Sequence, residues 1–113
     1  MKYYILIYTD NIKEGFGGMA NAFTIRIRPK YKNDIGLLEH EKVHVKQFWR
    51  TLGIYCILYP LSKEYRLKSE VEAYRKQLEF CEDKKYSRML FADNISTKYK
   101  LDITKVRAYD YLL

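Results

Sequence analysis

The sequence predicts an α+β domain with a small N-terminal antiparallel sheet, followed by helices and a mainly helical C-terminal segment. Residues 3–8 and 23–28 are rich in β-branched and aromatic side chains, as strands are. Residues 35–50 instead carry apolar side chains at helical spacing. The 113 residues, 48% of them hydrophobic, suit one core, so we expect a single domain over residues 1–113.

Composition narrows the class of protein before any motif is considered. With 5 Gly and 2 Pro the chain is neither collagen-like nor a linker. No apolar run reaches the roughly 18 residues of a membrane-spanning helix, and the N-terminus lacks a secretory cleavage pattern. Cys56 and Cys81 form no disulfide framework, and their apolar settings predict buried thiols. We therefore expect a cytoplasmic protein with no membrane partner.

The N-terminal part of the chain predicts two strands joined by a loop. Residues 3–8 form the first strand, and the glycine-containing residues 10–22 form a loop or wide turn. Residues 23–28 alternate apolar and polar side chains, as a half-buried strand does, and Pro29 ends this strand. We expect the two strands to share one antiparallel sheet.

The remainder of the chain predicts helices. Asp34 is a suitable N-cap for a helix over residues 35–50. Residues 51–61 form an apolar connector, for which its length favours burial over membrane contact. A further helix ends near residues 81–83. It begins near Glu70 if Ser69 and Glu72 form a capping box, or earlier, near Lys63. Residues 86–92 and 103–112 are weaker helix candidates.

The chemistry is concentrated in the only two histidines of the chain, His40 and His44. Four residues of helix rotate by about 400°, so both imidazoles lie on one face, one turn apart, where one divalent ion can bind both. Glu41 directly follows the first histidine and completes the zinc motif His-Glu-x-x-His. Two unpaired imidazoles among apolar neighbours would be costly to bury, and a bound metal removes that cost.

A catalytic zinc site needs a third protein ligand and an open position for water. Since no cysteine neighbours the histidines and no third histidine exists, a carboxylate must serve. We favour Glu70, because Ala73 lies on the same helix face and permits a close approach to the histidine helix. Glu72 is the fallback, although a capping box would explain it, and Glu79 lies nearer the helix end.

Three segments together resemble the gluzincin clan of zinc metallopeptidases and, at this length, the minigluzincins. These segments are His40-Glu41-Lys42-Val43-His44, the Glu70-Val71-Glu72-Ala73 run similar to the Glu-x-x-Ala of the family's glutamate helix, and Asn21-Ala22-Phe23. The tripeptide resembles the upper-rim strand that edges the substrate cleft in gluzincins. The segments follow the family's chain order and span roughly residues 21–77.

The resemblance implies a fold, an activity and a role for each matched residue. The fold is a small zincin-like domain, in which the antiparallel sheet packs on an active-site helix and a glutamate helix. The activity is that of a zinc metalloendopeptidase acting on peptides or proteins. His40, His44 and Glu70 would bind Zn²⁺, and Glu41 would act as general base. The strand edge from Asn21 to Arg28 would bind the extended substrate.

The chain also departs from the family pattern. Many gluzincins carry an acidic residue four positions after the ligand Glu, where this sequence has Tyr74. The groups that orient the imidazoles are therefore unassigned. Tyr74, Tyr109 and Tyr111 are unranked candidates for a tyrosine that assists the transition state, and residues 84–113 match nothing in the family.

Two other functions compete with a peptidase. The first is a zinc-binding structural or interaction protein without peptidase activity. The second is a basic nucleic-acid-binding protein, favoured by the net charge of +7 and by a basic run with one tyrosine, residues 26–32. The basic residues are spread over the whole chain and no nucleic-acid motif is present, so we expect no nucleic-acid partner. The oligomeric state is left open.

Overall fold

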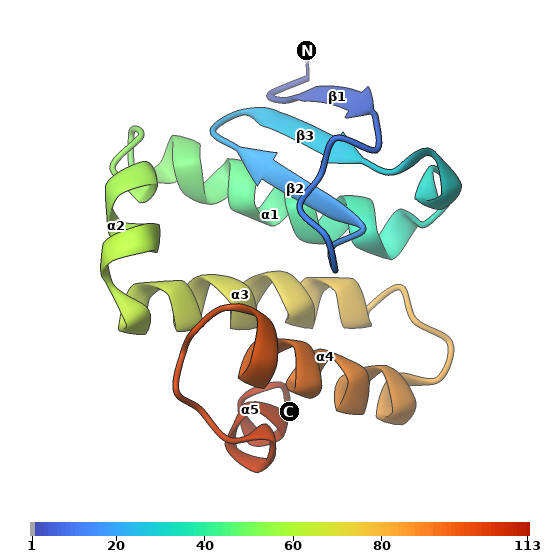
Figure 1. Cartoon of the computed structure of the whole chain (residues 1–113), viewed down its shortest axis with the longest axis vertical. Coiled ribbons are helices and arrows are strands. Elements are labelled where there is room, and N and C mark those ends of the chain that lie inside the picture. The colour runs from blue at the N-terminus through green and yellow to red at the C-terminus, as the bar shows by residue number, and fades with distance from the viewer. Residues whose placement is uncertain (1) are drawn as a thin grey trace.

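Helix α1 lies in the middle of the molecule, between a three-stranded sheet on one side and α3 on the other (Figure 1). A computed structural model describes residues 2–113 as an α+β fold, with α4 and α5 beyond α3. The elements in chain order are β1 (Ile5–Tyr8), β2 (Gly18–Asn21), β3 (Thr24–Ile27), a short 3-10 turn (Pro29–Tyr31), α1 (Ile35–Arg50), α2 (Tyr55–Leu61), α3 (Lys63–Leu78), α4 (Lys84–Lys98) and α5 (Lys105–Tyr111).

The sheet is mixed, with strand order β1-β3-β2, so the antiparallel pairing expected for residues 3–8 and 23–28 is wrong. β1 runs parallel to β3, and β2 runs antiparallel to β3. The reason is a third strand within the expected loop. The chain reverses once between β1 and β2 and again at Ala22, which has a φ of 54°, so β3 regains the direction of β1. In the strand order, β3 lies between β1 and β2 and is the middle strand of the sheet.

The loop between β1 and β2 is held by one arginine at the end of β3. The guanidinium of Arg28 donates hydrogen bonds to the carbonyls of Phe16 at 2.8 Å and Ile12 at 2.9 Å, and it pairs with Asp10. One residue of the basic run at 26–32 is thus used inside the fold.

Helix α1 begins where the sequence predicted. The Asp34 carboxylate accepts a hydrogen bond from the backbone N–H of Leu37 at 3.0 Å, which satisfies one free donor of the first turn. Val45 on one face of α1 packs against Ile25 and Ile27 of the sheet, and all three are nearly inaccessible to solvent. This small core fixes the sheet over α1.

The connector at residues 51–61 contains helix α2 and is mostly exposed, so its expected burial is wrong. Leu52 is 89% exposed and Leu61 is 81% exposed, whereas Tyr55 is buried. The expected burial of Cys56 is wrong for the same reason, and Cys81 is half-buried. The physical cause is geometric: α2 spans from the end of α1 to the start of α3 and turns only one side toward the protein (Figure 1).

Helix α3 has the earlier of the two predicted starts. Ser62 accepts a hydrogen bond from the backbone N–H of Tyr65 at 3.1 Å and caps the helix before Lys63. The capping box of Ser69 and Glu72 is therefore wrong, since both lie inside a continuous helix. Ser62 satisfies one free backbone donor of the first turn, and the helix runs without a break from Lys63 past residue 69.

The two C-terminal helices are confirmed, and the first is longer than predicted. They close a second core, separate from the one under the sheet, whose buried residues are Tyr74, Phe91, Ala92, Ile95, Leu101, Ala108 and Leu112. From Lys2 to Leu113, no helix combines the length and apolar character required to cross a membrane.

The core under the sheet predicts a contrast between two isoleucines. Ile25→Ala should lower the free energy of unfolding by about 2–5 kcal/mol, because it leaves a cavity between the sheet and α1. Ile7→Ala, on a half-exposed position of β1, should change it by no more than about 0.5 kcal/mol. Chemical denaturation of both variants checks this, and equal losses would contradict the packing described.

Candidate metal centre

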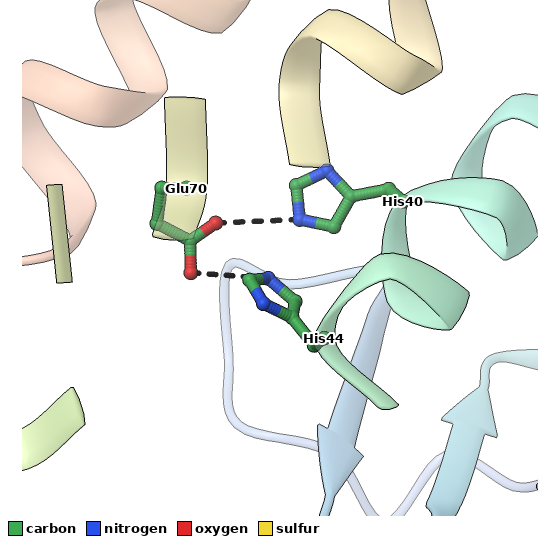
Figure 2. Close-up of side chains that lie close together, drawn as sticks. All are labelled: His40, His44 and Glu70. Carbon is green, nitrogen blue, oxygen red and sulfur yellow. Dashed lines mark ion pairs between the residues drawn. The ribbon is translucent and has the colours of Figure 1, made fainter. Parts of the chain in front are cut away.

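Helices α1 and α3 bring two imidazoles and one carboxylate to a common point (Figure 2). Nε2 of His40 lies 3.3 Å from Oε1 of Glu70, and Nε2 of His44 lies 3.2 Å from Oε2 of the same residue. All three side chains are buried. Among the residues described, these three form the one group of potential metal ligands, with ligand atoms within 4.8 Å of one another.

Small residues at the contact allow the two helices to approach. Ala73 is completely buried one turn after Glu70, as the sequence analysis expected. On the α1 side, a Cβ at Gly36 would lie 3.3 Å from Cγ of Gln77. A larger residue at Gly36 would have to displace Gln77, whose Oε1 lies beside Nδ1 of His40.

The ring orientation of His44 is set by Gln47, one turn further along α1. Nε2 of Gln47 donates to the carbonyl of Ser69 at 3.2 Å and to the carboxylate of Glu72 at 3.0 Å. Because both partners are acceptors, the Oε1 atom of Gln47 must face Nδ1 of His44, 2.9 Å away. Nδ1 of His44 is then the donor, which leaves the lone pair of Nε2 directed at Glu70.

His40 is oriented in a similar way from α3. Its Nδ1 lies 3.0 Å from Oε1 of Gln77, and its ring packs edge-on against Tyr74 with centroids 4.3 Å apart. Tyr74 occupies the position where many gluzincins have an acidic residue. Here the tyrosine supplies packing, and the glutamine one turn later supplies the acceptor.

The centre is rich in lone pairs and requires a positive charge. Oε1 of Glu70 is buried and has no hydrogen-bond partner within residues 2–113. Burial acts to raise the pKa of Glu70, but the two histidines beside its carboxylate, His44 above all, hold that pKa well below its ordinary value. Burial acts to lower the pKa of His44, yet Glu70, Glu41 and Gln47 raise it to about 9. A proton or a metal ion can supply the charge.

The ligand atoms are spaced as a metal requires. Zinc bonds of 2.0–2.1 Å in a tetrahedron place neighbouring ligand atoms about 3.3 Å apart. Each histidine Nε2 lies at a comparable distance, 3.3 and 3.2 Å, from one of the two Glu70 oxygens, and one ligand atom from each residue lies within 4.8 Å of the others. The group is therefore positioned to bind a metal ion, with His40, His44 and Glu70 as ligands.

Glu41 lies beside this group without belonging to it. Its side chain is buried, and the strand β2 passes so close that a Cβ at Gly18 would lie 3.4 Å from its Oε2. Burial raises the pKa of the Glu41 carboxyl, although the neighbouring histidine charges act to lower it. A carboxylate with a raised pKa next to a metal centre is suited to accept a proton.

An open cleft of about 600 Å³ gives access to the centre. Its lining includes the three ligand residues, Glu41, the strand β2 and two tyrosines of α2. Asn21 and Ala22, which the resemblance assigned to substrate binding, also line the cleft. Phe23 does not: it packs against Phe48 and Trp49, away from the metal centre.

The strand at the cleft is β2, so the expected edge strand from Asn21 to Arg28 is wrong. Asn21 ends β2, and β3 begins at Thr24 and is paired on both sides. β2 is the edge strand on the α1 side of the sheet, and it carries the free backbone groups near the histidines.

Sequence reasoning missed several residues that surround the ligands. Tyr59 donates a hydrogen bond to Oε2 of Glu70, and Tyr55 OH lies 3.3 Å from Nδ1 of His44. Burial and the Glu70 carboxylate raise the pKa of both phenols, so both keep their protons. The four-residue spacing of these tyrosines was a usable signal. None of the three tyrosines proposed, Tyr74, Tyr109 and Tyr111, lines the cleft, although Tyr74 packs against His40.

The fallback ligand Glu72 points the other way. Its carboxylate accepts hydrogen bonds from Gln47 and from Arg50 at 2.9 Å, on the outer side of the contact between α1 and α3.

No protein-family model, curated protein or solved structure matches this chain.

The two glutamates predict different metal affinities. Glu70→Gln should lower zinc affinity beyond the roughly 10–100-fold expected for residues that only support a ligand, because it removes a ligand charge. The matched variant Glu72→Gln should lose no more than that supporting range. Chelator competition measures both affinities, and metal analysis gives the stoichiometry.

His44→Ala should likewise lose zinc, and full retention in that variant would exclude His44 from the ligands.

Gln77 predicts a smaller effect on the same measurement. Gln77→Leu removes the acceptor that orients His40 and should weaken zinc binding by about 10–100-fold while one ion is still bound at saturation. Lys76→Gln, on the half-exposed neighbouring position, serves as the control and should bind zinc as the parent does. Equal affinity in the two variants would remove Gln77 from the centre.

Proposed function

We propose that this protein is a zinc-dependent metallopeptidase with a zincin-like fold, related in its site to the gluzincins. One observation carries the proposal: His40, His44 and Glu70 converge on one point in an open cleft that also holds Glu41. The resemblance of the three sequence segments adds to it. The arrangement combines three ligands, a buried carboxylate and an accessible fourth side, as hydrolytic zinc sites do.

Zinc is the metal we infer from the donor set. Two imidazoles and one carboxylate form a known ligand set of catalytic zinc, and the three ligand atoms lie within 4.8 Å of one another. When bound, zinc supplies a Lewis acid that polarises a carbonyl and makes water acidic near neutral pH.

The residues of the chain supply the remaining chemistry. Glu41 takes the proton from the attacking water and delivers it to the leaving amine. Gln47 and Gln77 keep the Nε2 lone pairs of the histidines on the metal side. Tyr59 and Tyr55 wall the cleft next to His44. The free edge of β2 hydrogen-bonds the main chain of an extended peptide, as edge strands can.

The competing functions account for less of the site. A structural zinc site closes with four protein ligands, whereas the described part of the chain offers three beside an open cleft. A nucleic-acid-binding protein has no need of buried His40, His44, Glu41 and Glu70. Its basic run is also partly used in the fold, since Arg28 holds the β1–β2 loop.

The proposal predicts a separation of metal binding from hydrolysis. Glu41→Gln should bind zinc stoichiometrically and lose hydrolysis of a mixed peptide pool by at least about 100-fold, because the proton acceptor is gone. Glu39→Gln is the matched control on the same helix. Its carboxylate pairs with Lys42, and that variant should keep parental activity.

The measurement is peptide cleavage by mass spectrometry, with a chelator-treated sample alongside. Hydrolysis by Glu41→Gln at the parental rate would exclude Glu41 as the base. A zinc-loaded parent that cleaves no peptide would favour the non-catalytic zinc protein.

A further inference from the structure

The mouth of the cleft is strongly basic, and no part of the site described so far uses that charge. Four cationic side chains line it together with the metal centre: Lys13, Arg66, Lys98 and Lys100. They come from the β1–β2 loop, from α3, from the last residue of α4 and from the segment that follows α4. We call these four residues the cationic rim.

The rim is held together by Phe16 and by backbone carbonyls. The ammonium groups of Lys13 and Lys98 lie 5.8 and 5.6 Å from the ring centre of Phe16. Lys98 also donates to the carbonyl of Gly15 at 2.7 Å, which ties α4 to the β1–β2 loop across the cleft. The guanidinium of Arg66 donates to the carbonyls of Tyr59, Tyr99, Lys100 and Pro60.

The charge of the rim is not neutralised within the described chain. All the hydrogen-bond acceptors of Lys98 and Arg66 are neutral carbonyls, and none of the eight ion pairs between residues 2 and 113 includes a rim residue. The carboxylates among the described lining residues are Glu41 and Glu70. A bound divalent ion would balance those two, which leaves the four positive charges of the lining without an acidic partner there.

We propose that the cleft binds peptides bearing acidic side chains close to the segment that lies over the metal centre. The inference rests on the proposed peptidase function and names its substrate class. Cationic walls attract carboxylates and repel basic side chains, and a cleft with low-dielectric walls concentrates the field. The edge strand β2 can hold the main chain without regard to side chains, so the cationic rim is left to select among side chains.

Binding and cleavage are measured separately, so that the two proposals can fail independently. Three peptides of equal length carry Asp, Asn or Lys at alternate positions and a dye of zero net charge. Fluorescence anisotropy with zinc-loaded Glu41→Gln protein gives affinities without cleavage. We expect the order Asp, then Asn, then Lys, and a smaller spread when salt rises from about 0.05 M to about 0.5 M, because ions screen exposed charges.

Variants assign the preference to the rim. Lys13→Gln with Lys100→Gln removes two exposed rim charges whose ammonium groups donate no hydrogen bond in the described structure. An exposed ion pair contributes roughly 1.5- to 5-fold in affinity, so the double variant should bind the Asp peptide about 5-fold more weakly and the Asn peptide unchanged. Lys85→Gln with Lys105→Gln removes the same charge outside the cleft and should bind as the parent does.

Each outcome decides the inference. Equal affinities for the three peptides, or equal losses in the two double variants, overturn it even if the parent cleaves peptides. An Asp preference that depends on the rim upholds it even if the parent cleaves nothing, in which case the proposed function alone fails. A single-stranded oligonucleotide that binds more tightly than the Asp peptide through the same two lysines would overturn the assignment to peptides.

Discussion

The carboxylate of Glu70, buried between two imidazoles, is the constraint on which the rest of the structure depends. A buried carboxylate without compensation is too costly to keep, so the groups around it must supply positive charge and hydrogen bonds. His40 and His44 face it, and Tyr59 donates to it. One oxygen accepts no hydrogen bond from the described residues, and it belongs to the group that is positioned to bind a metal ion.

The same constraint divides the protein into two apolar cores with a polar layer between them. One core lies between the sheet and α1, and the other lies among α3, α4 and α5. The buried polar side chains gather where α1 meets α3 and β2: His40, Glu41, His44, Gln47, Ser69 and Glu70. These side chains interact through directional hydrogen bonds and through opposite charges. The packing of α1 against α3 therefore depends on those hydrogen bonds and on the ion that the centre can bind.

Local sequence patterns predicted the parts of the site that depend on local geometry. The spacing of His40 and His44 places both rings on one face of any helix, and Ala73 marked the face of α3 that approaches α1. Gln77 was not predictable, because a contact with a residue 37 positions away depends on how two helices cross. The parallel pairing of β1 and β3 was missed because β2 is a short strand, Gly-Met-Ala-Asn, with no strand-forming pattern.

Helix α2 is an apolar segment that is mostly exposed, and the positions of its two tyrosines explain why. Tyr55 and Tyr59 are four residues apart, so a helix presents both on one face, and that face meets His44 and Glu70. The positions between and beyond them must then point outward, as the exposure of Ile57 and Leu61 shows. The helical spacing of α2 therefore places both phenols at the centre and leaves its other apolar side chains exposed. Tyr55 and Tyr59 are four residues apart, as His40 and His44 are. Each pair lies on one face of its helix, and both faces meet at the Glu70 carboxylate.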